Sequence, residues 1–280
     1  MSSLRDKLVY LKHNSKILTL VWYYGRQPMF KYKNRKLERE AEKRRNGYED
    51  ERYIGLKQYK NIHDGKRCFI IATGPSLKVS DLEMLKDEYT FGMNSICKLY
   101  DDISWRPTYY GIQDSNVYEK LQSVILDVYS EKKDVFIGSG IASKYPIPDN
   151  FQQFPWNGAY HDNELEVNNY FSKFSDDCYS IVYDGYSITY SLIQIAIYMG
   201  FKEIYLLGAD CSYKKGEKNH VVESGFIDKN EEKNYDKMIT GYKSAKEYAE
   251  KSGVKIINCT RGGMLEVYER KSLEEVLDSK

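Results

Sequence analysis

From residue 67 onward, short apolar runs alternate with longer amphipathic stretches. The apolar runs predict buried strands at residues 68–73, 90–93, 108–112, 135–138, 180–182, 203–207 and 254–258. The amphipathic stretches predict helices at residues 81–86, 117–128, 187–199, 236–251 and 272–278. This alternation is typical of a parallel sheet covered by helices on both faces. The sequence therefore predicts an α/β protein with a Rossmann-like, doubly wound, mostly parallel sheet.

The first predicted strand leads into a distinctive turn. Six residues suited to a buried strand, 68–73, run directly into Gly74, Pro75 and Ser76. The pattern from Ser80 to Glu83 is that of a capping box and predicts the start of a helix. In such a strand–turn–helix unit, backbone N–H groups and a helix N-terminus face an anionic ligand. We expect this turn to bind a nucleotide, although Gly74 could serve the turn alone.

The first 64 residues differ in character from the rest. Residues 7–24 place apolar side chains at roughly helical spacing, and residues 31–45 carry eight Lys or Arg against three Glu. This pattern suits a peripheral membrane helix that contacts anionic headgroups. We favour the alternative, a helical extension that packs on the main domain or on a second subunit, because polar residues at 12–14 and 16 interrupt the apolar face. We predict a helical, basic extension at 1–64, with such a contact through residues 1–45, and a nucleotide-binding transferase domain at 65–280.

Composition narrows the class of protein. The 41% hydrophobic and 30% charged content indicates a globular protein, and the net charge of +1 gives no reason to expect nucleic-acid binding. The five cysteines are scattered without CxxC spacing, which favours reduced, buried thiols and no zinc site. The first apolar run lacks a small-residue cleavage site. We therefore expect a cytoplasmic protein, with a peripheral position at the inner face of the membrane as the alternative.

Polar residues follow the predicted strands at the edge where α/β sheets bind ligands. Asn94 follows the second strand, Gln113 and Asp114 the third, and Asp210 the penultimate one, while Ser187 precedes the most apolar helix. Hydroxyl and amide groups suit hydrogen bonds to ribose, base and phosphate. Asn94 and Asp114 could instead cap helices, and Asp210 could only hold its loop. Residues 140–180, rich in proline, are predicted to form an irregular lobe or lid.

Several common motifs are absent. The sequence contains no GxxxxGK[ST], no GxGxxG and no GxSxG, and no Asp-x-Asp follows a predicted strand. We therefore expect no metal or other cofactor. His220 is the candidate general base, since it lies in a polar loop downstream of a strand tip, although it could be a solvent-exposed loop histidine. His161, in the irregular segment, is the second candidate.

Four segments resemble a known family. They are IIATGPSLK (70–78), GMN (92–94), DGYSITYSLIQIAIYMGFKEIYLLGADCSY (184–213) and GYKSAKEYAEKSGVKIINCTRGGMLEVYER (241–270). These segments are similar to proteins grouped as 6-hydroxymethylpterin pyrophosphokinase MptE-like, a group that includes the motility accessory factors that glycosylate flagellin. The same pattern resembles bacterial CMP-sialic-acid-dependent sialyltransferases. The resemblance covers about residues 67–270.

The sialyltransferase resemblance implies roles for several residues. Ser187 and Thr189 would contact the nucleotide, and Gly74 and Ser76 would approach the phosphate and ribose of the donor. Tyr213 would stabilise the leaving phosphate, and His220 would be the catalytic base. A second phosphate-binding tyrosine of that family could here be only Tyr235 or Tyr242, and the spacing to His220 is shorter than in the family.

Three functions remain open from the sequence. The first is a metal-independent glycosyltransferase that uses a CMP-activated nonulosonic acid or a related nucleotide sugar, acting on a surface glycan or lipid-linked acceptor. The second is pyrophosphoryl transfer from ATP to a hydroxymethylpterin, which needs Mg²⁺ on carboxylates such as Asp114 and Asp210. The third is a non-catalytic nucleotide-binding protein of envelope-polysaccharide biosynthesis.

Overall fold

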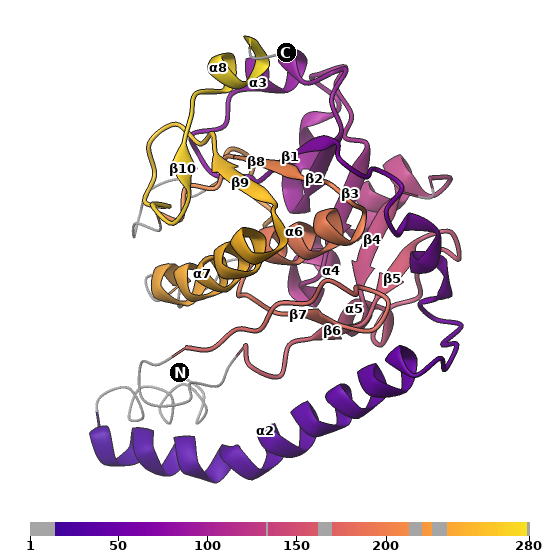
Figure 1. Ribbon diagram of the computed structural model, residues 1–280, viewed down its shortest axis with the longest axis vertical. Helices are drawn as coiled ribbons and strands as arrows, with labels where there is room; N and C mark the ends of the chain where they lie inside the picture. The colour runs from indigo at the N-terminus through magenta and orange to yellow at the C-terminus, as the bar shows by residue number, and fades with distance from the viewer. Residues whose placement is uncertain (1–14, 133, 162–169, 213–219, 226–233, 279–280) are drawn as a thin grey trace, which may run out of the picture.

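The fold is built around one parallel sheet whose strand order reverses at its first strand (Figure 1). The computed structural model describes residues 15–132, 134–161, 170–212, 220–225 and 234–278. The strands of the main sheet are β1 (Arg67–Ile71), β2 (Thr90–Met93), β3 (Tyr109–Ile112), β4 (Val135–Gly138), β5 (Gln152–Phe154), β8 (Glu203–Leu207), β9 (Lys255–Asn258) and β10 (Glu269–Arg270). Their order is β10-β9-β8-β1-β2-β3-β4-β5, and every neighbouring pair is parallel. The Rossmann-like, doubly wound prediction is confirmed.

Helices cover both faces of this sheet. They are α3 (Val79–Met84), α4 (Ser115–Tyr129), α5 (Ser139–Ala142), α6 (Ile188–Tyr198), α7 (Asn234–Ser252) and α8 (Leu273–Asp278), with 3-10 helices η1 (Ile54–Tyr59) and η2 (Asn94–Leu99). Successive side chains of β1 point to opposite faces of the sheet. Cys68 and Ile70 belong to the hydrophobic cluster with α6 and α7, and Phe69 belongs to the cluster with α3, α4 and α8. This alternation follows from the two-residue period of a strand.

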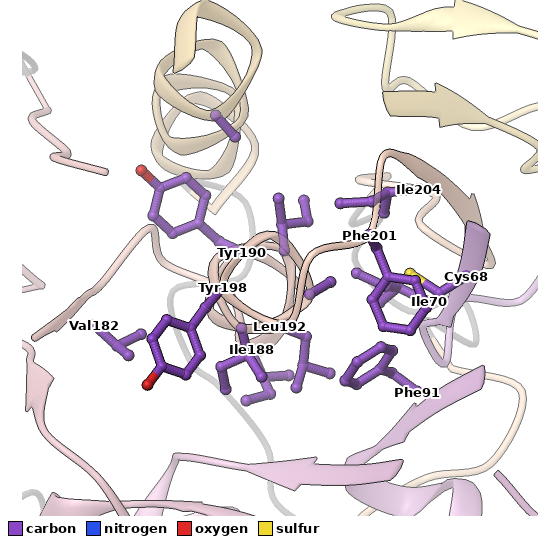
Figure 2. Packing of buried hydrophobic residues seen from close by; sticks show 14 of the residues in the cluster. Cys68, Ile70, Phe91, Val182, Ile188, Tyr190, Leu192, Tyr198, Phe201 and Ile204 are labelled. Carbon is purple, nitrogen blue, oxygen red and sulfur yellow. The ribbon is translucent and has the colours of Figure 1, made fainter. Parts of the chain in front are cut away.

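Helix α6 is the centre of one layer (Figure 2). Its residues from Ile188 to Ala196 are all buried, since the sheet lies beneath the helix and α7 packs against it. Figure 2 shows Leu192 directed toward Ile70 and Phe91 of the sheet. Gly111 of β3 permits this approach, because a Cβ there would lie 2.6 Å from a methyl group of Leu192. An apolar helix of this kind is typical of a doubly wound interior.

The predicted elements of this domain agree with the structure within about two residues, with two corrections. Helix α3 begins at Val79, because the carboxylate of Asp81 accepts the N–H of the N-cap residue Lys78 at 3.1 Å. The capping box predicted from Ser80 to Glu83 is therefore wrong. The strand predicted at 180–182 is β7 (Val182–Tyr183), which pairs with β6 (Trp156–Asn157) in a separate two-stranded sheet. Helices α6 and α7 are each followed by a glycine in the left-handed conformation typical of a helix C-cap, with φ of 94° at Gly200 and 67° at Gly253.

The segment predicted as an irregular lobe is partly regular. Its residues 152–154 form β5, the edge strand of the main sheet, and residues 156–157 form β6. Pro155 separates these strands, and each is too short to show a two-residue period in the sequence. Residues 162–169 of this segment lie outside the described part of the chain.

The N-terminal extension contains one long helix, α2 (Lys16–Arg45), which continues through Pro28. Its second half packs on the main domain: Phe30 joins a cluster with Tyr160, and Ala41 joins Ile181 and Tyr183. Farther along, Leu56 and Tyr59 of η1 belong to the main core cluster. The division at residue 64 therefore stays a prediction, and the main core includes side chains that precede it.

Three further features of the structure concern the cysteines, the hydrophobicity of the helices and metal ligands. All five cysteines are buried and free, as predicted. Within the described ranges, no helix is both long enough and apolar enough to cross a membrane. Those same ranges hold no group of three or more His, Cys, Asp or Glu arranged to bind a metal ion.

Candidate functional site

A polar crevice lies at the carboxyl ends of β1 and β8, where the strand order reverses. In open α/β sheets this switch point is the general position for ligands. The crevice is lined by Ala72, Thr73, Gly74, Met93, Asn94, Ser187, Ile188, Thr189, Gly208, Ala209, Asp210, Cys211, Ser212, His220, Met238 and Tyr242. It therefore brings together six of the predicted site residues: Gly74, Asn94, Ser187, Thr189, Asp210 and His220.

The turn after β1 is tied to the end of β8. Gly74 donates its N–H to the carbonyl oxygen of Gly208 at 2.9 Å, and a Cβ at Gly74 would lie 2.0 Å from Oδ2 of Asp210. Ser76 donates its hydroxyl to the same Oδ2 at 2.8 Å, and Pro75 has no N–H to offer. Glycine is required here because two strand tips approach closely. The N–H of Gly74 is engaged inside the protein, so a phosphate contact by this turn stays a prediction.

Asp210 is a buried carboxyl group at the floor of the crevice. Burial raises its pKa, and the hydrogen bond from Ser76 opposes that shift. Its backbone carbonyl oxygen accepts the N–H of Met264 at 2.7 Å, and a Cβ at Gly263 would lie 2.6 Å from that oxygen. Asp210 therefore both lines the crevice and holds the loops after β8 and β9 together.

Asn94 combines two costly features at the end of β2. Its backbone is left-handed, with φ of 46°, and its carbonyl oxygen accepts the hydroxyl of Tyr110 at 2.6 Å. The side-chain oxygen Oδ1 is buried and has no hydrogen-bond partner. A buried amide oxygen without a partner costs roughly 1–3 kcal/mol. Strain and an unmet acceptor in a crevice mark Asn94 as a candidate ligand contact.

The N-terminus of α6 forms one wall of the crevice. Ser187 is the N-cap, and its hydroxyl accepts the N–H of Thr189 at 3.2 Å. The Thr189 hydroxyl donates to the Met93 sulfur at 3.4 Å. The start of this 11-residue helix carries partial positive charge, which favours an anion at this wall.

His220 is held over the end of β1. Its Nδ1 lies 3.2 Å from the hydroxyl of Thr73, and the N–H of the next residue, Val221, donates to the carbonyl oxygen of Thr73 at 2.8 Å. Farther along the same segment, Lys98 of η2 donates to the carbonyl oxygen of Glu223 at 2.9 Å. These bonds orient the imidazole at the crevice. Tyr213, the predicted partner of His220, lies outside the described residues.

Gln113 and Asp114 do not line the crevice. Asp114 is the N-cap of α4 and accepts the N–H of Asn116 at 2.7 Å, so its helix-capping interpretation is the one that the structure bears out. Gln113 accepts the hydroxyl of Ser191 at 2.6 Å and donates to Oδ1 of Asp184 at 3.4 Å.

Asp184 organises a second cluster beside the crevice. Its Oδ2 lies 2.7 Å from Nδ1 of His161, and its Oδ1 accepts the N–H of Tyr186 at 3.2 Å. The Asp184 side chain is fully buried, whereas that of His161 is 44% exposed. A buried carboxylate that fixes the orientation of a partly exposed imidazole is a recurrent acid–base arrangement. The loop from Asp184 to Ser187 joins this cluster to the crevice wall.

Helix α7 contributes two lining residues, one of which, Tyr242, was an alternative for the second phosphate-binding tyrosine. Met238 and Tyr242 come from α7, four residues apart on its buried face. The helical period of this segment predicts that they share a face, but the sequence does not show that α7 reaches the crevice. Gly241 allows that approach, since a Cβ there would lie 2.7 Å from the carbonyl oxygen of Gly185.

The fold and crevice define a doubly wound α/β protein with a polar crevice at its switch point. More specifically, the chain belongs to the 6-hydroxymethylpterin diphosphokinase MptE-like family, whose model matches residues 47–216. No protein of curated function matches the chain.

Two solved structures are similar to the chain at low identity. One is the MAf glycosyltransferase from Magnetospirillum magneticum AMB-1, with 16% identity and a TM-score of 0.44 over 80% of this chain and 38% of that chain. The other is the sialyltransferase CstII from Campylobacter jejuni in complex with a substrate analogue, cytidine-5'-monophosphate, with 15% identity and a TM-score of 0.38 over 74% of this chain and 85% of that chain. This chain therefore spans well under half of the MAf structure.

Proposed function

We propose that the protein is a metal-independent glycosyltransferase that uses a CMP-activated nonulosonic acid or a related nucleotide sugar. The acceptor would be a surface glycan or a lipid-linked glycan, and the site of action the cytoplasm. The observation that carries the proposal is the composition of the crevice at the switch point. Its described lining contains hydroxyls, an amide, one histidine and the buried carboxyl group of Asp210, but no lysine or arginine. Such a lining suits a nucleotide with one phosphate better than a triphosphate.

The residues of the crevice suggest how the donor would bind. The buried Oδ1 of Asn94 needs a hydrogen-bond donor, which a ribose hydroxyl or the cytosine amino group would supply. The phosphate would lie at the N-terminus of α6, near Ser187 and Thr189. No divalent ion is needed to neutralise the single phosphate of a CMP-sugar.

The reaction exchanges one bond at the sugar for another. In this proposal His220 takes the proton from the acceptor hydroxyl, whose oxygen then bonds to the anomeric carbon. The bond from that carbon to the phosphate oxygen breaks, and CMP leaves with its electron pair. Tyr213 would donate a hydrogen bond to the leaving phosphate. His161, oriented by the buried Asp184, is the second candidate for the base.

The family description favours a second candidate function, diphosphoryl transfer from ATP to a hydroxymethylpterin. That reaction needs Mg²⁺ held by carboxylates. Of the two carboxylates expected for this role, Asp210 lines the crevice, whereas Asp114 caps α4. A non-catalytic nucleotide-binding role in envelope-polysaccharide biosynthesis is the third candidate.

Thermal unfolding with nucleotides separates these functions. CMP should raise the Tm without Mg²⁺, while UDP, GDP and ATP should have little effect. Asn94→Ala should remove the CMP-dependent shift, whereas Asn46→Ala, an exposed substitution on the helical extension, should retain it. A shift produced only by ATP with Mg²⁺ would favour the diphosphokinase. CMP binding without turnover on any acceptor would favour the non-catalytic role.

A further inference from the structure

The first half of α2 carries a stripe of apolar side chains with large exposed fractions. Ile17, Leu20, Val21 and Tyr24 follow the spacing i, i+3, i+4 and i+7, which places them on one helix face. Their exposed fractions are 74%, 42%, 64% and 67%. Tyr32, two turns farther on and 71% exposed, continues the same face. An exposed row of this length marks an interaction surface.

The second half of α2 is already occupied by contacts with the domain. Phe30 is 7% exposed and packs edge-to-face on Tyr160 with ring centroids 4.9 Å apart, and Asn34 donates to the Tyr160 hydroxyl at 3.0 Å. Glu38 accepts the hydroxyl of Tyr183 at 2.9 Å. The second half of the helix is therefore anchored, and Figure 1 shows α2 along the border of the molecule. The side chains of the stripe on its first half are exposed.

The positive charge around the stripe indicates what kind of surface it would bind. Residues 7–37 contain eight Lys or Arg and no Asp or Glu. Two copies that met through this face would bring these like charges together, at an electrostatic cost. A bilayer with anionic headgroups complements both properties, because it accepts apolar side chains and attracts lysine and arginine. The first acidic residue after this run, Glu38, lies in the second half of α2 and accepts a hydrogen bond from Tyr183 of the domain.

We propose that the first half of α2 lies in the interface of a membrane that contains anionic lipids. Ile17, Leu20 and Val21 enter the boundary between headgroups and acyl chains, and Tyr24 and Tyr32 lie at the level of the headgroups. Lys31, Lys33 and Arg35 contact the phosphates of the lipids. The helix lies on the surface and does not cross it. This proposal is independent of the reaction that the crevice catalyses.

Sedimentation of the full chain with vesicles tests the proposal. The protein should bind vesicles of phosphatidylcholine mixed with phosphatidylglycerol at least about tenfold more tightly than vesicles of phosphatidylcholine alone, and added salt should weaken the binding. The combined substitution Val21→Asp and Tyr24→Ser should abolish it. Met29→Ser is the matched control, since Met29 is 61% exposed on the same helix but about a third of a turn away from the stripe.

The charge is tested separately. Replacing Lys31, Lys33 and Arg35 by glutamine should reduce the preference for phosphatidylglycerol and the dependence on salt. The Tm of each variant should match that of the unmodified protein, because the stripe is outside the core. Equal binding to both vesicle types, no binding to either, or equal loss with Met29→Ser would overturn the proposal. So would a dimer in solution that only the stripe variant dissociates.

Discussion

At the scale of single residues, two histidines compete for the role of base. We predict that His220→Ala lowers turnover about 10²–10⁴-fold, the usual contribution of a general base, and leaves the CMP-dependent rise in Tm unchanged. The reason is that Nδ1 of His220 is bonded to Thr73 at the crevice, while the predicted nucleotide contacts come from other segments. Steady-state rates with a CMP-sugar, paired with thermal unfolding, measure both effects.

The matched control is His161→Ala, which removes the second imidazole. If His220 is the base, this variant retains most of its turnover. Turnover that survives His220→Ala and disappears in both His161→Ala and Asp184→Asn would transfer the role to His161, since Asp184 orients that ring at 2.7 Å.

The residues of the crevice were only partly predictable from the sequence. Gly74, Asn94 and Asp210 follow strands of one parallel sheet, and the carboxyl ends of such strands meet at one edge. Gln113 also follows a strand, but its side chain bonds to Ser191 and Asp184 beside the crevice. The position of a polar residue after a strand does not show which neighbour will form a hydrogen bond with its side chain. That choice depends on tertiary packing.

At the scale of elements, the attachment of α2 to the domain depends on the buried Arg44, which joins Asp50 of the extension and Ser180 of the domain. Nη1 of Arg44 lies 3.0 Å from Asp50, and Nη2 of Arg44 donates to the carbonyl oxygen of Ser180 at 2.7 Å. We predict that Arg44→Ala destabilises the protein by about 1–3 kcal/mol, since it leaves the carbonyl oxygen of Ser180 without this donor, whereas Asp50 keeps its ion pair with Arg52. Denaturant unfolding measures the change.

The adjacent residue supplies the control. Lys43 pairs with Glu40 at 2.9 Å, but its side chain is 60% exposed. Lys43→Ala should therefore change the free energy of unfolding by less than about 1 kcal/mol. Equal effects of the two substitutions would show that the buried Arg44 does not hold α2 on the domain.

The sequence predicted the long helices more accurately than the shortest strands. Helices α4, α6 and α7 are long enough to repeat an apolar period, and their predicted bounds lie within two residues of the observed ones. Strands β5 and β6 have three and two residues, which is too few for a period to show. Two separate patterns were expected before residue 46, at 7–24 and 31–45, and the described residues from 16 onward form the single helix α2. The described contacts of its apolar side chains with the domain begin at Phe30.

At the scale of the whole molecule, the alternation of strands and helices predicted the class of fold but not the order of strands. The order decides where the ligand site lies. Strands β2 to β5 extend to one side of β1, and β8 to β10 extend to the other. The helices that leave β1 and β8 therefore diverge onto opposite faces, and a crevice remains between the two strand ends. Asp184 and α7 reach this region from more than one hundred residues downstream of Gly74.

From this position of the crevice, we predict where CMP slows the exchange of backbone amide hydrogens. CMP at the switch point should slow exchange in the segments that line the crevice, at residues 72–77, 93–97, 186–190, 208–212 and 220–224. It should leave exchange unchanged in α2 and around a second cavity of about 260 Å³, which lies between α2 and residues 155–157. Mass spectrometry of the chain with and without CMP gives both sets of rates.

Slower exchange confined to α2 and residues 155–157 would move the nucleotide to that cavity. The second cavity is lined by Lys36, Arg44 and Arg52, whereas the described lining of the crevice contains no lysine or arginine. The exchange rates therefore also decide whether cationic side chains or amides and hydroxyls bind the nucleotide.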